Sequence, residues 1–169
     1  LDVVAVRGNV DTRLRKVTDG ELDAVVLAYA GLARLARLDA VTEVLEPDQM
    51  LPAPGQGALA VECRDVEPDA ALLAALRDLD DDATRAAVTA ERSLLAALEA
   101  GCSAPVGALA TVTEVDDEVL VHLTGAVVSD DGLTQVRTSV TGPAGDAEAV
   151  GRELAGHLLA AGAPGLLVP

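Results

Sequence analysis

Aromatic residues are almost missing from this chain of 169 residues, in which Tyr29 is the single one and neither tryptophan nor phenylalanine occurs. Half of the residues are nevertheless apolar. A packed core must therefore be built from leucine, valine and alanine. Lysine is also nearly absent, since Lys16 stands alone and the other basic residues are arginines. The length is compatible with one large domain or two small ones.

Positive charge is scarce throughout the chain. The formal net charge is -16, which argues against binding to nucleic acid or to anionic membranes. Two interpretations of this acidity stay open. The first is an ordinary solvated surface. The second is halophilic adaptation to concentrated intracellular salt, which screens the repulsion between carboxylates and which the acidic run over residues 78–82 favours.

Long apolar runs and metal-site spacings are absent as well. No run approaches the length of a transmembrane helix, and there is no signal peptide, so we expect a cytoplasmic protein without a membrane partner. Cys63 and Cys102 do not have the spacing of a metal site, and His122 and His157 stand alone, so we predict no metal. We do not expect a disulfide between the two cysteines of an intracellular protein.

The first part of the chain alternates between two kinds of pattern. Leu1–Val6 and Asp23–Ala30 are short continuous apolar segments, typical of buried strands. Residues 11–17, capped by Asp11 or Thr12, and 31–38 are predicted helices. This alternation predicts a right-handed parallel unit, whose ligands bind at the carboxyl ends of the strands. Because the chain opens with leucine inside an apolar run, we expect it to be the tail part of a longer polypeptide.

The second part of the chain has an α+β pattern. Residues 47–57 are rich in proline and glycine and predict a segment that crosses between domains, followed by a strand over residues 58–64. Two helices are predicted next, and the second is capped by residues 80–82 and ended by Gly101. A three-stranded antiparallel meander and a final helix complete this part. The predicted helices span residues 68–79, 83–100 and 146–161, and the predicted meander strands span 105–115, 119–129 and 134–141.

Cys102 lies in the string GCSAP, between the predicted helix and the first meander strand. By itself, a free cysteine is most often a small buried hydrophobe. Gly101 and Pro105, however, favour a short loop that presents the cysteine to a ligand. The loop follows the negative C-terminal end of a helix, which disfavours a thiolate. A reaction partner of Cys102 would therefore have to be strongly electrophilic.

Three arginines are candidates for binding carboxylates. Arg7 follows the first predicted strand, Arg13 lies on the helix after it, and Arg34 lies on the next helix. In a parallel sheet all three would converge on one edge, where guanidinium groups match carboxylates better than lysine does. The alternative is that they form ordinary surface ion pairs. Gln56, between two glycines, is either a ligand contact or part of a plain turn.

Three strings together resemble the second half of the porphobilinogen deaminase family, also called hydroxymethylbilane synthases. They are RGNVDTRL, LPAPGQGALAVEC and GCSAPVG, which begin at Arg7, Leu51 and Gly101. The resemblance covers essentially the whole chain and implies an α/β plus α+β fold. Residues 1–50 would be the second half of domain two, a partial lobe like that of periplasmic binding proteins. Residues 51–79 would return to domain one, and residues 80–169 would form the C-terminal α+β domain with the cofactor cysteine.

The resemblance also implies roles for individual residues. Cys102 would carry a dipyrromethane cofactor through a thioether, Arg7, Arg13 and Gln56 would bind this cofactor, and Arg34 would bind substrate. The parent protein would be a transferase that joins four porphobilinogen units and releases ammonia, in tetrapyrrole and haem biosynthesis. Residues outside the family pattern are given plainer roles. Arg15 and Arg37 are predicted to face solvent and Cys63 to lie in the core. For Arg92 the favoured interpretation is a surface pair with a glutamate, and the alternative is that it faces the cofactor loop.

One departure from the family pattern is large. The family's catalytic aspartate, in a KD-x-P string, has no counterpart in this sequence, so we assign no catalytic residue to this chain. We expect the chain alone to be inactive and to pair with the missing N-terminal half or to self-associate, whereas the parent would be a monomer. The alternative is a non-catalytic fragment that binds carboxylated small molecules.

Overall fold

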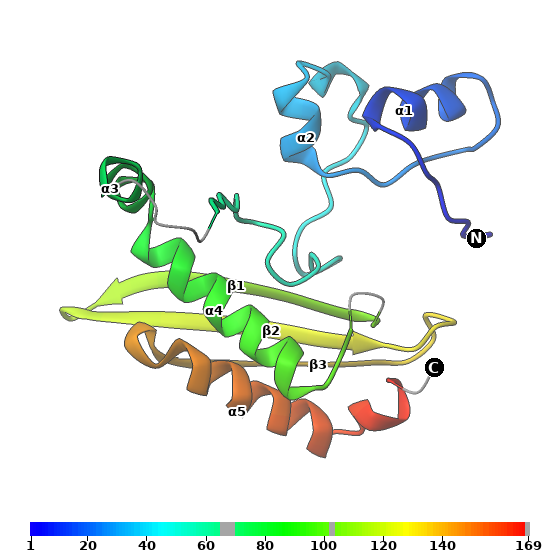
Figure 1. Ribbon diagram of the computed structural model, residues 1–169. Coiled ribbons are helices and arrows are strands. Elements are labelled where there is room, and N and C mark those ends of the chain that lie inside the picture. The colour runs from blue at the N-terminus through cyan, green and yellow to red at the C-terminus, as the bar shows by residue number, and fades with distance from the viewer. Residues whose placement is uncertain (65–69, 102–103, 168–169) are drawn as a thin grey trace. The chain divides into compact units, whose positions relative to one another are not determined.

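The computed structural model describes residues 1–64, 70–101 and 104–167. The chain divides into two compact units, Leu1–Leu45 and Glu46–Pro169, and each is described by itself. The division of the sequence into segments 1–50, 51–79 and 80–169 stays a prediction about the arrangement in a whole protein. Figure 1 labels the elements of both units.

The N-terminal unit contains the helices α1 (Val10–Thr18) and α2 (Tyr29–Arg34) and the 3₁₀ helix η1 (Leu38–Ala40). The cap of α1 is Asn9, whose side chain accepts a hydrogen bond of 2.9 Å from the backbone N–H of Thr12. The prediction of Asp11 or Thr12 as the cap was therefore wrong by two or three residues. Among its described hydrophobic residues, only Leu32 is fully buried in this unit.

The strands predicted over residues 1–6, 23–30 and 58–64 are not formed, although the structure describes all of these residues. Val3, Val26 and Leu59 are 88%, 63% and 80% exposed. A buried parallel strand needs a neighbouring strand for its backbone groups and cover on both faces. No described segment pairs with these three. The periplasmic-binding-protein-like lobe is accordingly not seen in this chain.

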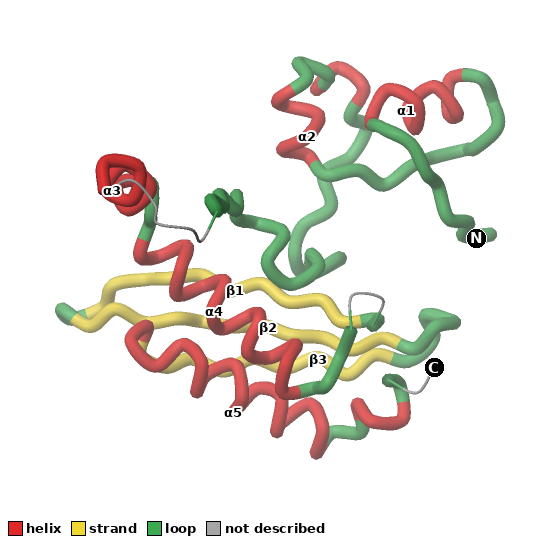
Figure 2. Tube along the Cα trace, in the orientation of Figure 1, coloured by secondary structure: helices red, strands yellow, loops and turns green. Residues whose placement is uncertain are grey.

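The C-terminal unit is an α+β domain, as the sequence pattern predicted. Its sheet has the order β1-β2-β3, and both pairs of neighbours are antiparallel, which confirms the meander. The ribbon and the tube trace show α4 and α5 lying next to each other across one face of this sheet (Figures 1 and 2). The elements are α3 (Ala70–Asp78), α4 (Asp82–Ala97), β1 (Val106–Val115), β2 (Glu118–Val128), β3 (Gln135–Pro143), η2 (Ala144–Asp146), α5 (Ala147–Ala160) and η3 (Ala163–Gly165).

Small and aliphatic side chains form the core between the sheet and the two helices. Leu94 of α4 and Leu154 and Leu158 of α5 are fully buried, together with Leu123 of β2. Gly125 of β2 faces the same helices, because a Cβ there would lie 2.9 Å from a methyl group of Leu94. Because the core has no large aromatic side chains, it is filled by packing the helices close to the sheet.

Helix α4 ends differently from the prediction. Its last helical residue is Ala97, and Glu99 rather than Gly101 adopts the left-handed conformation, with a φ of 52°. The backbone N–H groups of Glu99 and Ala100 donate to the carbonyls of Ala96 and Leu95 at 3.0 and 3.1 Å. This pair of bonds is a Schellman motif, formed here with a glutamate at the position that glycine usually occupies.

A segment before the domain crosses the sheet face that the helices leave open. Gly107, Ala126 and Arg137 are neighbours across β1, β2 and β3. A Cβ on Gly107 would lie 2.8 Å from Cβ of Leu51, and Arg137 donates to the carbonyls of Asp48 and Pro47 at 2.7 and 3.1 Å. Residues 47–52 are therefore part of the C-terminal unit.

Candidate functional site

The string RGNVDTR builds its own local structure around the start of α1. Gly8 has a φ of 122°, and a Cβ there would lie 3.0 Å from Cγ2 of Thr12, so only glycine fits without strain. The carbonyl of Gly8 accepts a hydrogen bond of 2.8 Å from Nε of Arg13. This bond orients the guanidinium and leaves its two Nη groups without a partner among the described residues.

Arg7 and Arg34 are exposed and form no ion pair with any residue that the structure describes. In so acidic a chain, unpaired arginines are available for an anionic ligand. Arg37, which was predicted to face solvent, instead donates to Asp11 at 2.7 Å and is only partly exposed. The predicted sheet edge that would bring Arg7, Arg13 and Arg34 together is absent. Arg7, Arg13 and Arg34 all lie in the N-terminal unit, but no sheet edge brings them together there.

Cys102 lies outside the described residues, so its predicted role stays a prediction. The described elements on either side of it are α4, which ends at Ala97, and β1, which begins at Val106. Cys63 is a free thiol on the surface. The prediction that Cys63 lies in the core was wrong, because it depended on a strand over residues 58–64 that does not form.

Gln56 lies in a tight turn of the C-terminal unit. Its backbone N–H donates to the carbonyl of Ala53 at 3.2 Å, and Gly55 adopts a left-handed φ of 78°. The side chain of Gln56 is exposed. Both interpretations of this residue remain open, since an exposed amide on a glycine turn suits a ligand contact and a plain connection equally.

The structure reveals one residue that the sequence reasoning missed. Glu91 of α4 is only 5% exposed, and its two carboxylate oxygens accept hydrogen bonds from different segments. Oε2 accepts from the backbone N–H of Gly55 at 2.6 Å, and Oε1 accepts from that of Ala110 in β1 at 2.8 Å. A signal was present in the sequence, because Glu91 shares its helix face with Leu94 and Leu98 at spacings of three and seven residues.

A groove of about 1300 Å³ runs between residues 54–60 and α4. Gly55 and Gly57 line one side, and Arg85, Arg92 and Arg152 line the other. Arg85 pairs with Asp80, and Arg152 pairs with Glu148. Arg92 has no ion pair within the described part of the chain, so its predicted pair with a glutamate stays a prediction. The turn that carries Gln56 thus borders a groove lined by Arg92.

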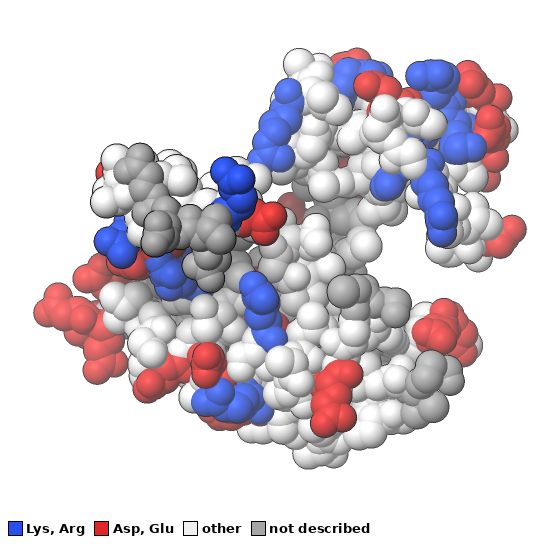
Figure 3. All heavy atoms as spheres, in the orientation of Figure 1, with Lys and Arg blue, Asp and Glu red and all other residues white. Residues whose placement is uncertain are grey.

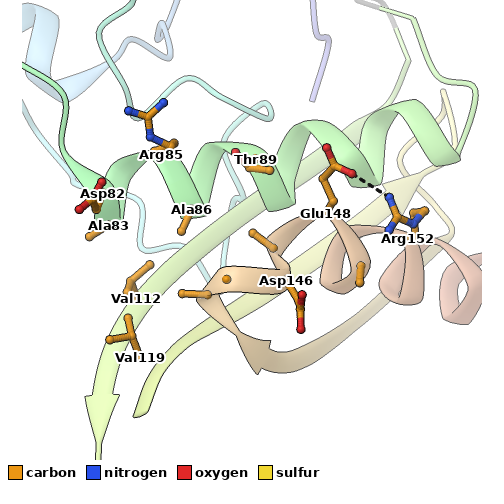
Figure 4. Close-up of a pocket in the computed structure, with 14 residues that line it drawn as sticks. Asp82, Ala83, Arg85, Ala86, Thr89, Val112, Val119, Asp146, Glu148 and Arg152 are labelled. Carbon is orange, nitrogen blue, oxygen red and sulfur yellow. Dashed lines mark hydrogen bonds and ion pairs between the residues drawn. The ribbon is translucent and has the colours of Figure 1, made fainter. Parts of the chain in front are cut away.

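A second hollow, of about 760 Å³, lies at the N-terminal ends of α4 and α5. Figure 4 shows Asp82 and Arg85 on α4, Val112 and Val119 on the two strands, and the ion pair between Glu148 and Arg152 on α5. Arg7, Arg13, Arg34 and Gln56, the described residues among those predicted to bind cofactor or substrate, do not line this hollow. We therefore assign no role to it.

Carboxylates are scattered over the visible surface, with arginines between them rather than in one basic patch (Figure 3). Two carboxylates are stabilised locally in their charged form. Hydrogen bonds from the side chain and the backbone of Thr84 lower the pKa of Asp81, the cap of α4. The hydroxyl of Ser129 and the backbone N–H of Leu133 likewise lower the pKa of Asp131. These shifts belong to a helix cap and a hairpin turn, not to a catalytic group.

The described residues contain no group of three or more histidine, cysteine or acidic side chains suited to hold a metal ion. Within the same ranges, none of the helices has both the length and the apolar character needed to cross a membrane. The site features on which an assignment depends are therefore the arginines of the first unit, the turn at Gln56 and the connection that contains Cys102.

These features define a class of protein: an acidic α+β module, preceded by a unit whose Arg7 and Arg34 form no ion pair with the described residues. Two family models match the chain. The model described as "Porphobilinogen deaminase, dipyromethane cofactor binding domain" matches residues 1–72, and "Porphobilinogen deaminase, C-terminal domain" matches residues 85–160. Arg7, Arg13, Arg34 and Gln56 lie in the first match, and Cys102 lies in the second. The chain belongs to the porphobilinogen deaminase family.

Curated relatives agree with this assignment. The chain is 59% identical to a porphobilinogen deaminase of Nocardia farcinica over 99% of its own length and 49% of the relative. It is 58% identical to porphobilinogen deaminase 1 of Streptomyces coelicolor over 99% of its length and 53% of the relative. For the Mycobacterium tuberculosis protein these values are 56%, 99% and 55%. The chain thus spans about half the length of the curated relatives that it matches.

Proposed function

We propose that this chain is part of a hydroxymethylbilane synthase, a transferase of tetrapyrrole and haem biosynthesis. Such an enzyme joins four porphobilinogen units head to tail, loses one ammonia for each unit, and releases the product by hydrolysis. The observation that carries the proposal is the pair of family matches, which together span both units of the chain. They include every residue to which a role is assigned below.

The side chains present suit a dipyrromethane with acetate and propionate groups. Among the described residues, Arg7 and Arg34 have no competing ion pair and the Nη groups of Arg13 have no partner. Guanidinium groups bind carboxylates in a two-pronged geometry. We assign Arg7, Arg13 and Gln56 to the cofactor and Arg34 to substrate. Held by a thioether to Cys102, the dipyrromethane supplies the primer to which pyrrole units are added.

The chain's own residues bind and orient in this proposal, and they do not supply the proton-transferring carboxylate. We place the catalytic aspartate in the part of the relatives that this chain does not cover. The exposed apolar side chains of Val3, Val26, Leu59 and Val61 support pairing with that part, because solvated apolar surface favours association. A cytoplasmic location and a monomeric parent enzyme are part of the same proposal.

Peptide mass mapping of the full-length holoprotein tests the cofactor assignment. We expect a dipyrromethane adduct on the peptide that contains Cys102 and none on the peptide that contains Cys63. An adduct at Cys63 would contradict the assignment. An assay of the purified chain of 169 residues is the second test, and formation of uroporphyrin above background would show that the chain is catalytically complete.

The second candidate function is a ligand-binding module without catalysis. Arg7 and Arg34, which form no ion pair with the residues that the structure describes, favour it, because they serve carboxylate binding whether or not a reaction follows. An assay of the full-length protein distinguishes the two functions, because only a transferase turns over porphobilinogen. Binding of porphobilinogen without release of ammonia would support the module, whereas release of ammonia supports the transferase.

A further inference from the structure

We propose that Glu91 is a positioning residue, which holds the Gly55–Gly57 turn against the two elements that flank Cys102. The inference rests on the proposed function, since that function makes the turn and the cysteine parts of one cofactor site. Glu91 itself is not assigned a contact with cofactor or substrate. It acts through the backbone of Gly55 and Ala110.

The geometry of the clamp is specific to a carboxylate. Each oxygen of Glu91 accepts one backbone N–H, at 2.6 Å from Gly55 and at 2.8 Å from Ala110. Neither a hydrophobic side chain nor an amide would satisfy both donors, because an amide offers one acceptor and turns its own N–H groups toward the other donor. Among the described residues no cation pairs with Glu91. Its buried charge is therefore stabilised by these two bonds.

The clamp joins three segments that are far apart in the sequence. Glu91 lies on α4, which leads into the connection with Cys102, and Ala110 lies on β1, which leads away from it. Gly55 immediately precedes Gln56. One carboxylate thus links α4, β1 and the turn with the proposed cofactor contact.

A neighbouring contact fixes the same segment to β1. The backbone N–H of Ala108 donates to the carbonyl of Pro52 at 2.9 Å. Ala108 and Ala110 both direct their N–H groups away from β2, at the free edge of the sheet. Pro52 and Glu91 together cover this edge, which would otherwise expose unpaired backbone donors. The turn at Gln56 is therefore held at a defined place relative to β1.

Amide hydrogen exchange in the chain of 169 residues tests the clamp without reference to function. We expect Glu91→Gln to speed exchange at Gly55 by roughly ten- to a hundredfold, the equivalent of one lost charge-assisted hydrogen bond. Glu153→Gln makes the same chemical change at an exposed position of α5 and should leave Gly55 unaffected. Unchanged exchange at Gly55 in Glu91→Gln would overturn the proposal. If Glu91→Gln does not fold, Glu91→Asp replaces it, because the shorter carboxylate cannot reach both donors.

Cofactor occupancy in the full-length enzyme tests the positioning role. We expect Glu91→Gln to lower the fraction of folded protein that carries the Cys102 adduct, as measured by intact mass. Leu158→Ala, a core change away from the clamp, controls for lost stability and should keep full occupancy. Normal occupancy in Glu91→Gln despite faster exchange at Gly55 would overturn the role. An adduct missing from the wild type would instead refute the proposed function, while the exchange experiment would still decide whether Glu91 holds the turn.

Discussion

Ser93 of α4 donates a hydrogen bond of 2.7 Å from its hydroxyl to the backbone carbonyl of Glu148 in α5. One turn further along α5, a Cβ on Gly151 would lie only 2.6 Å from Cβ of Ser93. The two helices therefore approach each other to a distance that only glycine permits at position 151. This close approach substitutes for large side chains in a core without aromatic residues.

Replacement of Gly151 tests this packing. We expect Gly151→Ala to lower the free energy of unfolding by about 1–3 kcal/mol, because the added methyl group forces α4 and α5 apart. Gly156→Ala on the same helix is the control, since nothing lies within 4 Å of its Cβ position. That change should stabilise by up to about 1 kcal/mol through helix propensity. Urea denaturation of both variants measures the difference, and equal effects would contradict the close approach.

The end of α4 offers a stabilising change. Glu99 has a φ of 52°, which costs a residue with a side chain roughly 1–2 kcal/mol relative to glycine. We expect Glu99→Gly to raise the free energy of unfolding by about 1 kcal/mol, after the greater freedom of glycine in the unfolded chain is taken into account. Glu99→Ala keeps the strain and should give no gain. A loss of stability in Glu99→Gly would show that the glutamate side chain has a role of its own.

The cap of α4 gives a prediction for pH. The hydrogen bonds from Thr84 lower the pKa of Asp81 below its ordinary value of 3.8. The stabilisation is therefore present above that value and is lost as the pH falls through the lowered pKa of the folded state. We expect wild type to melt above Asp81→Asn at neutral pH and this gap to close below about pH 3.8. Asp2→Asn removes an exposed carboxylate outside any helix and should show no such gap.

The response to salt separates the two interpretations of the acidity. If the net charge of -16 is a halophilic adaptation, the melting temperature should rise steadily as KCl is raised from dilute to molar concentration. The reason is that the Debye length falls to about 3 Å at 1 M, which screens repulsion between carboxylates. A flat or falling curve would leave an ordinary solvated surface as the explanation.

The arginines are tested by changes that keep their charge. In a full-length enzyme, Arg7→Lys and Arg13→Lys should each lower cofactor binding or turnover by about ten- to a hundredfold, the equivalent of roughly 1.5–3 kcal/mol for a charge-assisted bond. Lysine lacks the planar fork, and at position 13 it cannot preserve the Nε bond to Gly8. Arg15→Lys on the exposed face of α1 is the control. Small and equal effects at positions 7, 13 and 15 would show that Arg7 and Arg13 are ordinary surface residues.

Local patterns in the sequence were enough to predict most of the C-terminal unit. The alternation of apolar residues predicted β1, β2 and β3, and the turn residues Asp116 and Asp117, with φ values of 52° and 65°, end the first strand where expected. The acidic residues 80–82 were predicted to cap α4, and the cap in the structure is Asp81. These features depend on neighbours within a few residues, so the sequence alone contains their cause.

The sequence named candidate site residues but did not give their arrangement. The three family-like strings contain Arg7, Arg13, Gln56 and Cys102, and Arg34 was assigned from the same family resemblance. The two family matches together cover these five positions, and the roles assigned to them stay predictions. The bond from Arg13 to Gly8 and the lack of an ion pair between Arg34 and any described residue required coordinates, because several acidic residues compete for every arginine in this chain.

The sequence by itself determined the family, the meander and the helices, because short-range patterning and chemically distinctive strings encode them. Only the tertiary structure decided which apolar segments form strands, since a strand over residues 1–6 or 58–64 requires a partner to pair with. For the same reason it decided that Cys63 lies at the surface. Only the tertiary structure showed that Glu91 is buried between Gly55 and Ala110. The burial of that carboxylate depends on two backbone donors that lie 36 and 19 residues away in the sequence.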